Sequence, residues 1–511
     1  MSDMSDDYDD DYGQGSDDGF GYESYEGSDY GDDGNDGFDD VKPESLKRKP
    51  YEIAYEVLSV SDIQKQQDEL IEQVSSILGL SNENAMTLLL YFKWNNDRLL
   101  EHYTEDPEGV LKKAGVSISD DDKFVYEIKP VEGFFCDICC EDREGLMTFA
   151  LECDHRFCAE CYRQYATQKI VDEGESRNIT CAGDCTVVMN DSAIKTLVEP
   201  QVYGRYQTLL HRTFVLDNEH LIWCPAPNCE YAVKCDDVSA KDLTSVVPTV
   251  TCKCGHRFCF GCGLPDHQPS ICALVKKWIK KCEDDSETAN WISAHTKECP
   301  KCRATIEKNG GCNHMTCRKC KYEFCWICIG NWAEHGTSWY NCSRYDEKSG
   351  VDARDSQAKS RASLERYLHY YNRYANHEQS AKLDQDLYVR TEKKMTQLQS
   401  TSGMSWIEVQ YLAQASAALQ ECRQTLKWTY AFAFYLERNN DTHIFEDNQQ
   451  DLELAVEHLS LLFGKPIHEL AELKVQVMDR TAYCNKRREN LLSDTAKGLA
   501  EGRWKYQVQV K

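Results

Sequence analysis

Cysteines concentrated in the middle of the chain constrain its fold more than any other feature. The sequence has 27 cysteines in 511 residues, and twenty-five of them lie between Cys136 and Cys342, interspersed with histidines. Secreted disulfide scaffolds are also rich in cysteine, but they are short and follow a cleavable apolar leader, whereas this chain opens with Met-Ser-Asp and a run of carboxylates. We therefore expect reduced, metal-binding thiols in a protein of the cytoplasm or nucleus.

The cysteines divide into three series, each of which offers eight ligands. Zinc in a structural site prefers four sulfur or nitrogen ligands, and it can stabilise a module too small for a large apolar core. The spacing therefore predicts two zinc ions in each of three modules, six in all. The first series is Cys136, Cys139, Cys153, His155, Cys158, Cys161, Cys181 and Cys185. The second is Cys224, Cys229, Cys252, Cys254, Cys259, Cys262, His267 and Cys272. The third is Cys299, Cys302, Cys317, Cys320, Cys325, Cys328, His335 and Cys342.

An internal repeat supports this division. The frame C-x-x-x-F-C-x-x-C begins at Cys153, Cys254 and Cys320, and its aromatic residue is expected to pack beside the metal each time. His256 in the second copy occupies the place that His155 has in the first. Because the second series is complete without it, we expect His256 at the surface or beside a ligand, with ligation as the alternative.

Subtracting the twenty-one cysteines of the three series from the 27 isolates a candidate for chemistry. Six thiols remain: Cys140, Cys235, Cys282, Cys312, Cys422 and Cys484. Only Cys312 follows two glycines, which let the backbone approach a bulky reactant, and precedes a histidine, His314, by two residues. That imidazole can lower the pKa of the thiol or accept a proton from an attacking amine. From spacing alone, Cys312 is either a nucleophile, an inert thiol or a spare metal ligand.

At this point the motifs resemble a known family. The order of the modules and the sequence Gly-Gly-Cys-Asn-His-Met at 310–315 are similar to those of the RING, in-between-RING (IBR), RING2 ubiquitin ligases. Stretches at 339–345, 404–409 and 430–436 resemble the Ariadne branch of that family. The resemblance implies that the first RING recruits a ubiquitin-charged conjugating enzyme (E2), that ubiquitin passes to Cys312 as a thioester, and that a substrate lysine then attacks.

Three further residues are candidates for roles in this scheme, His314 and Ile138 by resemblance and Glu323 by its place in the third frame. His314 is expected to act as the general base for the amine step, or else to hold the loop by a hydrogen bond. Glu323 either polarises this site or is a solvated strand residue. Ile138, between the first two ligands of RING1, corresponds to the apolar position that RING domains use to bind the E2, with simple packing as the alternative.

The predicted fold class is multidomain, combining α-helical domains with small zinc-stabilised modules. The expected order is an acidic disordered tail (1–45), a UBA-like helical domain (46–120), RING1 (132–190), the IBR module (205–272), a helical linker (273–298), the catalytic RING2 (299–345) and a helical Ariadne domain (350–511).

The charge of the chain is concentrated at its start. Residues 1–40 contain sixteen Asp or Glu and no Lys or Arg, which contributes −16 to the net charge of −28. Such a segment cannot bury enough apolar surface to fold, so we expect solvated disorder, with docking to a basic partner or phosphorylation as alternatives. Since the chain is acidic and lacks a basic stripe, we do not expect nucleic acid as its main partner. The sequence contains no run of eighteen apolar residues, so we expect no membrane-spanning helix.

The UBA-like assignment rests on apolar residues at helical spacing from Ile63 to Tyr103. Gly79 is expected to end the first of three helices, Ser81 to cap the second, and Asn95 or Asn96 to cap the third. In Ariadne proteins this domain is associated with the ubiquitin-like modifier on cullins. The resemblance therefore implies a neddylated cullin-RING ligase as an activating partner, with packing alone as the alternative.

The remaining segments are predicted to be helical. The linker 273–298 has lysines beside apolar residues, so we expect two helical pieces joined by a polar hinge, whose basic face either holds ubiquitin or is merely solvated. Residues 351–511 carry long patterns of period 3.6, which predict a bundle of three or four long helices. By resemblance, this Ariadne domain inhibits the enzyme by covering Cys312, with Asp384 and Glu457 as contacts.

Two functions from different classes remain open on the residues alone. The first is a ubiquitin ligase with a covalent intermediate on Cys312. The second is a zinc scaffold that holds an E2 near its clients and never bears ubiquitin itself. The segment Gly311 to His314 separates the two, because a pure scaffold has no need of a thiol between glycine and histidine.

Overall fold

A computed structural model describes most of the chain after the acidic tail. The described residues are 48–116, 124–183, 185–238, 242–284, 296–308, 311–335, 342, 344–345, 356–402, 405–463, 465 and 467–510. The predicted tail (1–45) and the second half of the predicted linker, apart from its last three residues, lie outside these ranges.

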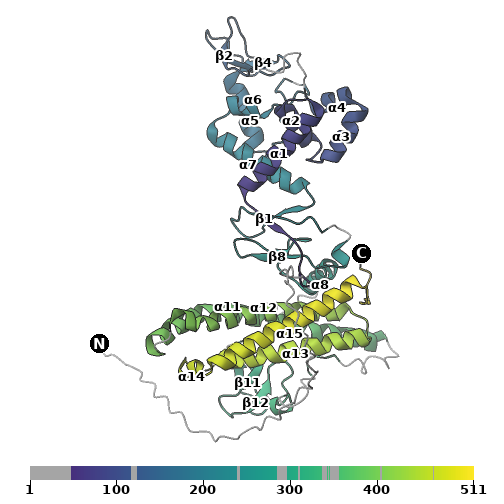
Figure 1. Ribbon diagram of the computed structural model, residues 1–511, viewed down its shortest axis with the longest axis vertical. Helices are drawn as coiled ribbons and strands as arrows, with labels where there is room; N and C mark the ends of the chain where they lie inside the picture. Colours follow the sequence, from purple (N-terminus) through teal and green to yellow (C-terminus); the bar gives the residue numbers. More distant parts are fainter. Residues whose placement is uncertain are drawn as a thin grey trace, which may run out of the picture. The chain divides into compact units, whose positions relative to one another are not determined.

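Four short helices form the N-terminal helical domain (Figure 1). They are α1 (Val60–Leu78), α2 (Asn82–Tyr91), α3 (Asn96–Glu105) and α4 (Pro107–Ala114). The predicted boundaries are confirmed, because Gly79 ends α1 with φ of 68° and the side chains of Ser81 and Asn95 cap α2 and α3. The fourth helix was not predicted. Asp106 caps it and a proline stands in its first turn, two standard start signals.

This domain packs against RING1 and the helix that follows it. The described part of RING1 has one sheet, β2 (Lys129–Pro130), β3 (Met147–Ala150) and β4 (Arg156–Cys158), and helix α5 (Ala159–Val171). Helices α6 (Asp191–Leu197) and α7 (Pro200–Asp217) follow it. Asn190 donates a hydrogen bond to Glu83 of α2 at 2.6 Å, and Trp94 meets Phe214 of α7 edge-on at 5.0 Å. Polar and aromatic contacts therefore hold the two parts together.

The IBR module includes a strand from outside its own sequence range. Its sheet has the order β1 (Glu56–Leu58), β6 (Ala232–Lys234), β5 (Leu221–Trp223), all antiparallel. The hairpin β7 (Thr249–Thr251) and β8 (Arg257–Cys259), the 3-10 turn η1 (Asp242–Thr244) and helix α8 (Cys272–Asp284) complete it. Helix α8 confirms the first helical piece of the predicted linker.

The described residues of RING2 form two small hairpins and one helical turn. These are β9 (Thr296–Glu298) with β10 (Thr305–Glu307), β11 (His314–Thr316) with β12 (Glu323–Cys325), and α10 (Trp332–His335). The end of the predicted helical linker is therefore strand β9 rather than helix.

The repeated cysteine frame forms the same hairpin in each module. Its aromatic residue lies at the centre of β4, β8 and β12, opposite an apolar residue of the preceding strand. Phe157 is 9 % exposed, and Phe258 and Phe324 are fully buried. The prediction of a packed aromatic in each copy is confirmed.

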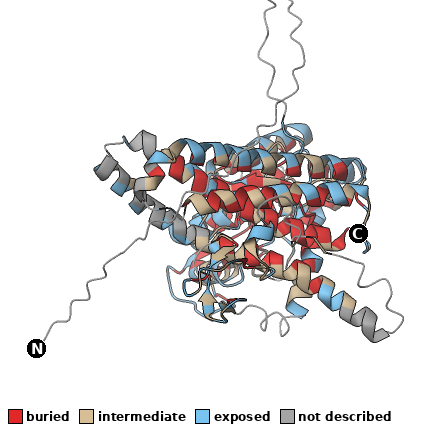
Figure 2. Ribbon diagram, turned by 90° about the horizontal axis from the view of Figure 1, so that it is seen from below, coloured by how far each residue is buried: buried red, intermediate tan, exposed pale blue. Residues whose placement is uncertain are grey.

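The C-terminal domain is the predicted helical bundle. Four long helices and one short helix form it: α11 (Ser356–Ser402), α12 (Trp406–Tyr435), α13 (Asn440–Phe463), α14 (Ile467–Glu472) and α15 (Lys474–Ala500). They run side by side, with buried residues between them (Figures 1 and 2). Tyr367 and Tyr374 of the predicted stripe are buried, whereas Leu364 is 46 % exposed.

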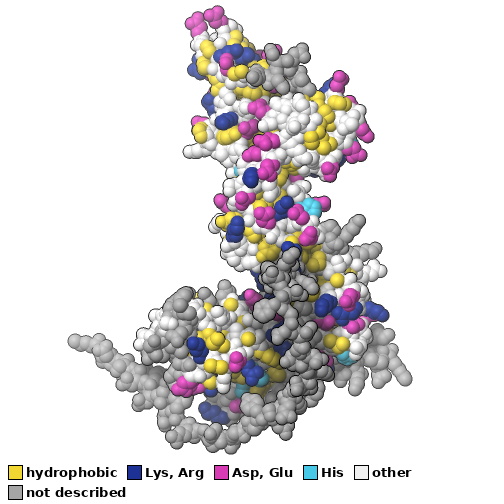
Figure 3. Space-filling model, in the orientation of Figure 1, with side chains coloured by type: hydrophobic (Ala, Val, Ile, Leu, Met, Phe, Trp, Pro, Cys, Tyr) yellow, Lys and Arg dark blue, Asp and Glu magenta, His cyan; other side chains and the backbone are white. Residues whose placement is uncertain are grey.

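The surface carries charge of both signs. Acidic and basic side chains are interspersed over the visible face of the helical domain and RING1 (Figure 3). Among the described helices, none combines the length and apolar content needed to cross a bilayer.

Gly115 lies where the helical domain contacts RING1, and its conformation allows a prediction about the stability of the fold. Its φ is +72°, its carbonyl accepts the Val188 N–H at 3.1 Å, and an added Cβ would overlap the Thr186 carbonyl oxygen. Gly79, at φ of +68°, has open space instead. Gly79→Ala should cost about 1 kcal/mol from backbone strain alone, and Gly115→Ala at least about twice that. Thermal unfolding of both variants tests this, and equal shifts in Tm would contradict it.

Candidate functional site

The structure gathers the predicted zinc ligands into compact groups. Within each group, all ligand atoms lie within 4.8 Å of one another. The groups are Cys136, Cys139, Cys158 and Cys161; Cys153, His155, Cys181 and Cys185; Cys224, Cys229, Cys252 and Cys254; Cys259, Cys262, His267 and Cys272; and Cys299, Cys302, Cys317 and Cys320.

These groups have the dimensions that zinc requires. A tetrahedron with Zn–S bonds of about 2.3 Å has sulfur atoms about 3.8 Å apart. Neighbouring sulfur atoms in four of the groups are 3.5–3.7 Å apart. His267 donates from Nδ1 to the Ser270 carbonyl at 2.6 Å, which leaves Nε2 directed at the sulfurs as a neutral ligand. The residues therefore fit zinc.

The connectivity of the groups differs between modules. In RING1 the two groups take alternate ligand pairs along the chain, whereas in the IBR module and in the first group of RING2 the ligands are consecutive. His256 belongs to none of the groups and stacks on Phe258 instead, with ring centroids 5.7 Å apart. The shared cysteine frame therefore predicts the hairpin, but it does not predict which four ligands make up one metal site.

In the second half of RING2, three predicted ligands meet. The thiols of Cys325, Cys328 and Cys342 hydrogen-bond to one another. The side chain of His335, the predicted fourth ligand, lies outside the described residues.

Cys312 lies apart from these groups, between strands β10 and β11. Its residue is partly exposed, and the backbone N–H of His314 donates to its sulfur at 3.3 Å. None of the groups given above contains it. The subtraction that singled out Cys312 therefore agrees with the geometry.

The structure brings His314 and Glu323 together. Their side chains are 3.2 Å apart, from Nε2 to Oε2, on the two strands of one hairpin. The imidazole also stacks on Trp332 of α10, with ring centroids 4.4 Å apart and planes 14° from parallel. Sequence reasoning missed Trp332. These two contacts fix the plane of the ring beside Cys312.

The C-terminal helices cover the same loop. Glu457 of α13 accepts from the backbone N–H of Asn313 at 2.5 Å and from its Nδ2 at 2.9 Å. Glu457 is 1 % exposed and lies 3.5 Å from the guanidinium of Arg423. The predicted contact through Glu457 is therefore present. The side chain of Asp384, the other predicted contact, lies outside the described residues.

This contact changes the ionisation of the thiol. Burial raises the pKa of Cys312 well above its ordinary value, and the charge of Glu457 and a hydrogen bond to that carboxylate raise the pKa further. The thiolate is the reactive form of a cysteine, and a raised pKa leaves less of it at neutral pH.

A second set of polar contacts was not predicted. Lys308 donates from Nζ to Asn313 Oδ1 at 3.1 Å, to Asn376 Oδ1 at 2.8 Å and to the hydroxyl of Ser380 at 3.0 Å. The Ser380 hydroxyl in turn donates to the Gly311 carbonyl. Asn376 lies only two positions after Tyr374, so it is off the predicted apolar stripe, and no local pattern singled these residues out.

The remaining candidates are spread over the molecule. Ile138 is 49 % exposed and Phe135, three residues before it, is 50 % exposed. The spare thiols Cys235, Cys422 and Cys484 are buried, and Cys140 is exposed. Exposure of Ile138 favours the E2 interface over simple packing.

Five family models match the chain in the order that the modules suggest. They describe the UBA-like domain of E3 ubiquitin-protein ligase ARIH1 (65–105), a C3HC4-type RING finger (136–183), an IBR domain that is a half RING finger (204–272), a further IBR domain (294–343) and the Ariadne domain (365–483). The last IBR match covers RING2.

Curated relatives align over nearly the whole chain. The chain is 57 % identical to E3 ubiquitin-protein ligase dbl4 of Schizosaccharomyces pombe, over 91 % of its own length and 92 % of the relative. Identity is 44 % to E3 ubiquitin-protein ligase ariadne-1 of Drosophila melanogaster, with 93 % and 96 % covered. Human E3 ubiquitin-protein ligase ARIH1 is 43 % identical, with 88 % and 82 % covered. With its metal-binding modules and helical C-terminal domain in the same order, the chain belongs to the Ariadne-type RING, IBR, RING2 family of E3 ubiquitin-protein ligases.

Proposed function

We propose that this ligase carries ubiquitin on Cys312. The Cys312 thiolate attacks the carbonyl carbon of the thioester that joins ubiquitin to an E2, a new C–S bond forms, and the E2 thiolate leaves. A substrate lysine amine then attacks the Cys312 thioester, an amide forms, and the thiol is released. The observation that carries this proposal is a thiol outside the metal-binding groups, two residues from an oriented imidazole.

His314 is proposed as the base for the second step. The attacking lysine must lose a proton, and an imidazole held by Glu323 and Trp332 is oriented to accept it. Glu323 is proposed to position this ring and to stabilise its protonated form, since the carboxylate lies 3.2 Å from Nε2.

RING1 is proposed to receive the E2 through Ile138 and its apolar neighbour Phe135. Both side chains are half exposed beside a metal-binding group, and exposed apolar residues favour protein contacts. Six zinc ions are proposed to hold RING1, IBR and RING2, two in each. The ligand groups and their sulfur spacing support this number.

The C-terminal domain is proposed to keep the enzyme inactive until a partner engages it. Glu457 binds the residue next to Cys312, and its charge and the burial of the loop raise the pKa of the thiol. A free-energy difference of about 2.7 kcal/mol between the closed and open states keeps about 99 % of the molecules closed. A partner that binds the open state more tightly by a similar free energy can therefore open the protein. The match of residues 65–105 to an Ariadne UBA-like domain supports a neddylated cullin-RING ligase as that partner.

Substitution of Cys312 tests the covalent intermediate. Cys312→Ala should abolish substrate ubiquitination, and Cys312→Ser should trap ubiquitin as an oxyester that survives reductant, because the serine oxygen is a poor leaving group. Gels with and without reductant, after mixing with charged E2, measure both. Cys140→Ser serves as a control because this thiol is also exposed and outside the metal groups. Undiminished ubiquitination by Cys312→Ala would refute the proposal in favour of a scaffold.

Substitution of His314 separates the two steps. His314→Ala should slow lysine transfer on the order of 10²-fold while thioester formation continues, since the proton to be lost belongs to the amine. Glu323→Gln should give a smaller loss, because the imidazole retains its stacking on Trp332. Single-turnover transfer from a preformed thioester measures the second step alone. If the thioester itself fails to form in His314→Ala, the histidine has a structural or thiol-activating role instead.

Glu457→Gln tests the inhibitory contact in the full chain. Loss of the carboxylate charge should lower the pKa of Cys312, so the alkylation rate of this thiol should rise about tenfold at neutral pH and its pH midpoint should shift downward. Asp451→Asn on the same helix, whose carboxylate is 49 % exposed and pairs with Arg487, is the matched control. Peptide mass spectrometry after iodoacetamide treatment reads the rate at Cys312. Equal rates in the two variants would argue against inhibition through Glu457.

A further inference from the structure

The first metal-binding group of RING2 is surrounded by cations that the proposed chemistry does not use. Two short turns supply its four cysteines, one at 299–304 between β9 and β10 and the other at 317–322 between β11 and β12. The basic residues of these turns are all exposed, and together they are called the RING2 basic patch: Lys301, Arg303, Arg318, Lys319 and Lys321.

The two turns share one backbone geometry and lie against each other. In each, the residue after the second cysteine has a positive φ, 57° at Arg303 and 55° at Lys321, and its N–H donates to the carbonyl of the first cysteine at 2.8 Å. The cysteine sulfurs are 3.6 Å apart across the turns, and Lys301 lies over the Tyr322 ring of the other turn, 5.8 Å from its centroid. The turns therefore hold the cations in one place before any ligand binds.

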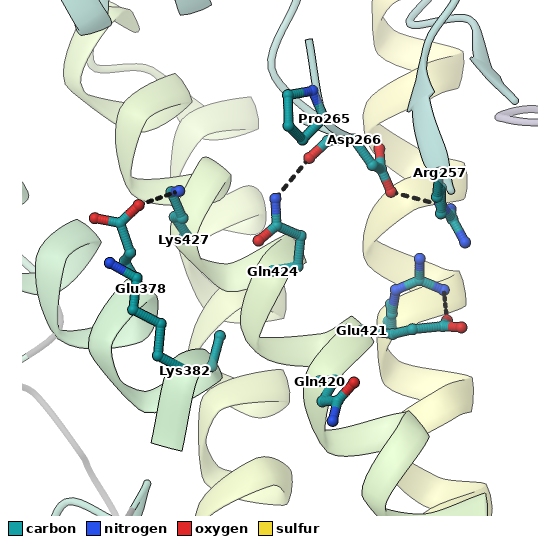
Figure 4. Close-up of a pocket in the computed structure, with 11 residues that line it drawn as sticks. Arg257, Pro265, Asp266, Glu378, Lys382, Gln420, Glu421, Gln424 and Lys427 are labelled. Carbon is teal, nitrogen blue, oxygen red and sulfur yellow. Dashed lines mark hydrogen bonds and ion pairs between the residues drawn. The ribbon is translucent and has the colours of Figure 1, made fainter. Parts of the chain in front are cut away.

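The charge of the patch has no counterpart within the described part of the chain. None of the five cations forms an ion pair or a side-chain hydrogen bond with a described residue. Figure 4 shows the opposite arrangement in the pocket between the IBR module and the Ariadne domain, where Lys427 is paired with Glu378 and Arg257 with Asp266. The patch is thus a local site of uncompensated positive charge in a chain of net charge −28.

Charge balance at the metal does not account for the patch. A zinc ion with four thiolates is negatively charged overall, so nearby cations can stabilise such a site. RING1 and the IBR module each contain a group of four cysteines as well. Within its ligand pairs, however, the RING1 group has only acidic charges, Asp137 and Glu160, and the IBR group has a single cation, Lys253. Four-cysteine groups in this chain therefore form without a cluster of cations.

The patch and Cys312 lie at opposite ends of the same strand. Strand β11 begins at His314, two residues after Cys312, and ends at Thr316, one residue before Cys317 of the second turn. Five residue steps of about 3.3 Å give a path of at most roughly 17 Å between the reactive thiol and the patch. An extended segment bound to the patch can therefore present a lysine about five residues away to Cys312.

We propose that the RING2 basic patch binds an acidic stretch of the substrate protein, and that the ligase thereby selects lysines that lie near Asp and Glu residues. Carboxylates complement exposed cations, and the two arginines can bind them through paired hydrogen bonds. A short acidic segment fits better than a nucleic acid, because the acidic remainder of the chain repels a long phosphate backbone. The inference rests on the proposed function, since it assigns a substrate class to the Cys312 thioester.

Binding is measured first, without chemistry. The probe is a fluorescent peptide with one lysine and a block of Asp and Glu about five residues from it, and Ser and Asn replace the block in a second peptide. Three full-length variants remove the cations of the first turn, of the second turn and of both: Lys301→Gln with Arg303→Gln; Arg318→Gln with Lys319→Gln and Lys321→Gln; and all five substitutions together. Lys112→Gln with Lys113→Gln, which removes two exposed charges from α4, is the matched control.

We expect the acidic peptide to bind the unchanged chain at least about tenfold more tightly than the neutral peptide, and each partial variant at least about threefold more weakly. The fivefold variant should lose the preference, and the control pair should keep it. Zinc content and Tm should stay the same throughout, and loss of zinc from the fivefold variant would overturn the proposal in favour of charge balance. Equal or tighter binding of a single-stranded oligonucleotide of the same charge would overturn it in favour of nucleic acid.

Transfer from a preformed Cys312 thioester then tests selection. In a single turnover, the unchanged chain should ubiquitinate the acidic peptide at least about fivefold faster than the neutral one, and the fivefold variant should use both at the slower rate. Discharge to free lysine should be equal in the two proteins, because it needs no docking. Equal rates for both peptides with the unchanged chain would overturn the substrate role. If the acidic peptide binds but no thioester forms on Cys312, the proposed function fails together with the substrate role, whereas the binding surface stands.

Discussion

Metal coordination is the constraint on which the rest of this structure depends. RING1, IBR and RING2 are built from strands of two to four residues, far too short to sustain a large apolar core. The ligand groups supply the missing stability, because folding and zinc binding are a single equilibrium in modules of this kind. Each repeated hairpin places one aromatic side chain beside its cysteines, among the buried apolar residues of the module.

Metal coordination also determines which thiols are available to react. Nearly all cysteines in the central region belong to a metal-binding group or are buried, so a thiolate there is either bound or inaccessible. Cys312 differs because its loop connects two hairpins and needs no metal to hold it. Among the residues that the structure describes, α11 and α13 hold this loop by hydrogen bonds. Such a contact is compatible with the proposed inhibition, since water can replace its hydrogen bonds.

Much of the fold could be predicted because it depends on local signals. Gly79, Ser81 and Asn95 end and begin helices through their own backbone and side-chain chemistry. The repeated frame forms its hairpin between residues close in sequence, from His314 to Cys325 in the third copy. The features that were not predicted involve partners that are distant in sequence. Strand β1 pairs with a strand more than 170 residues later, and the pairing of ligands in RING1 differs from that in RING2 although the frame is the same.

The sequence by itself determined the number and kind of modules, the ligands available to zinc, the spare thiol at Cys312 and the helical character of the C-terminal domain. Ligand type, helical period and capping are properties of neighbouring residues, so they can be read along the chain. Only the tertiary structure decided that α11 presents Asn376 and Ser380 to Lys308, that Glu457 lies against the backbone of Asn313, and that α8 belongs to the Ariadne core through Trp278. These contacts join residues 68 to 144 positions apart. Their existence follows from how whole helices pack, and no local pattern carries that information.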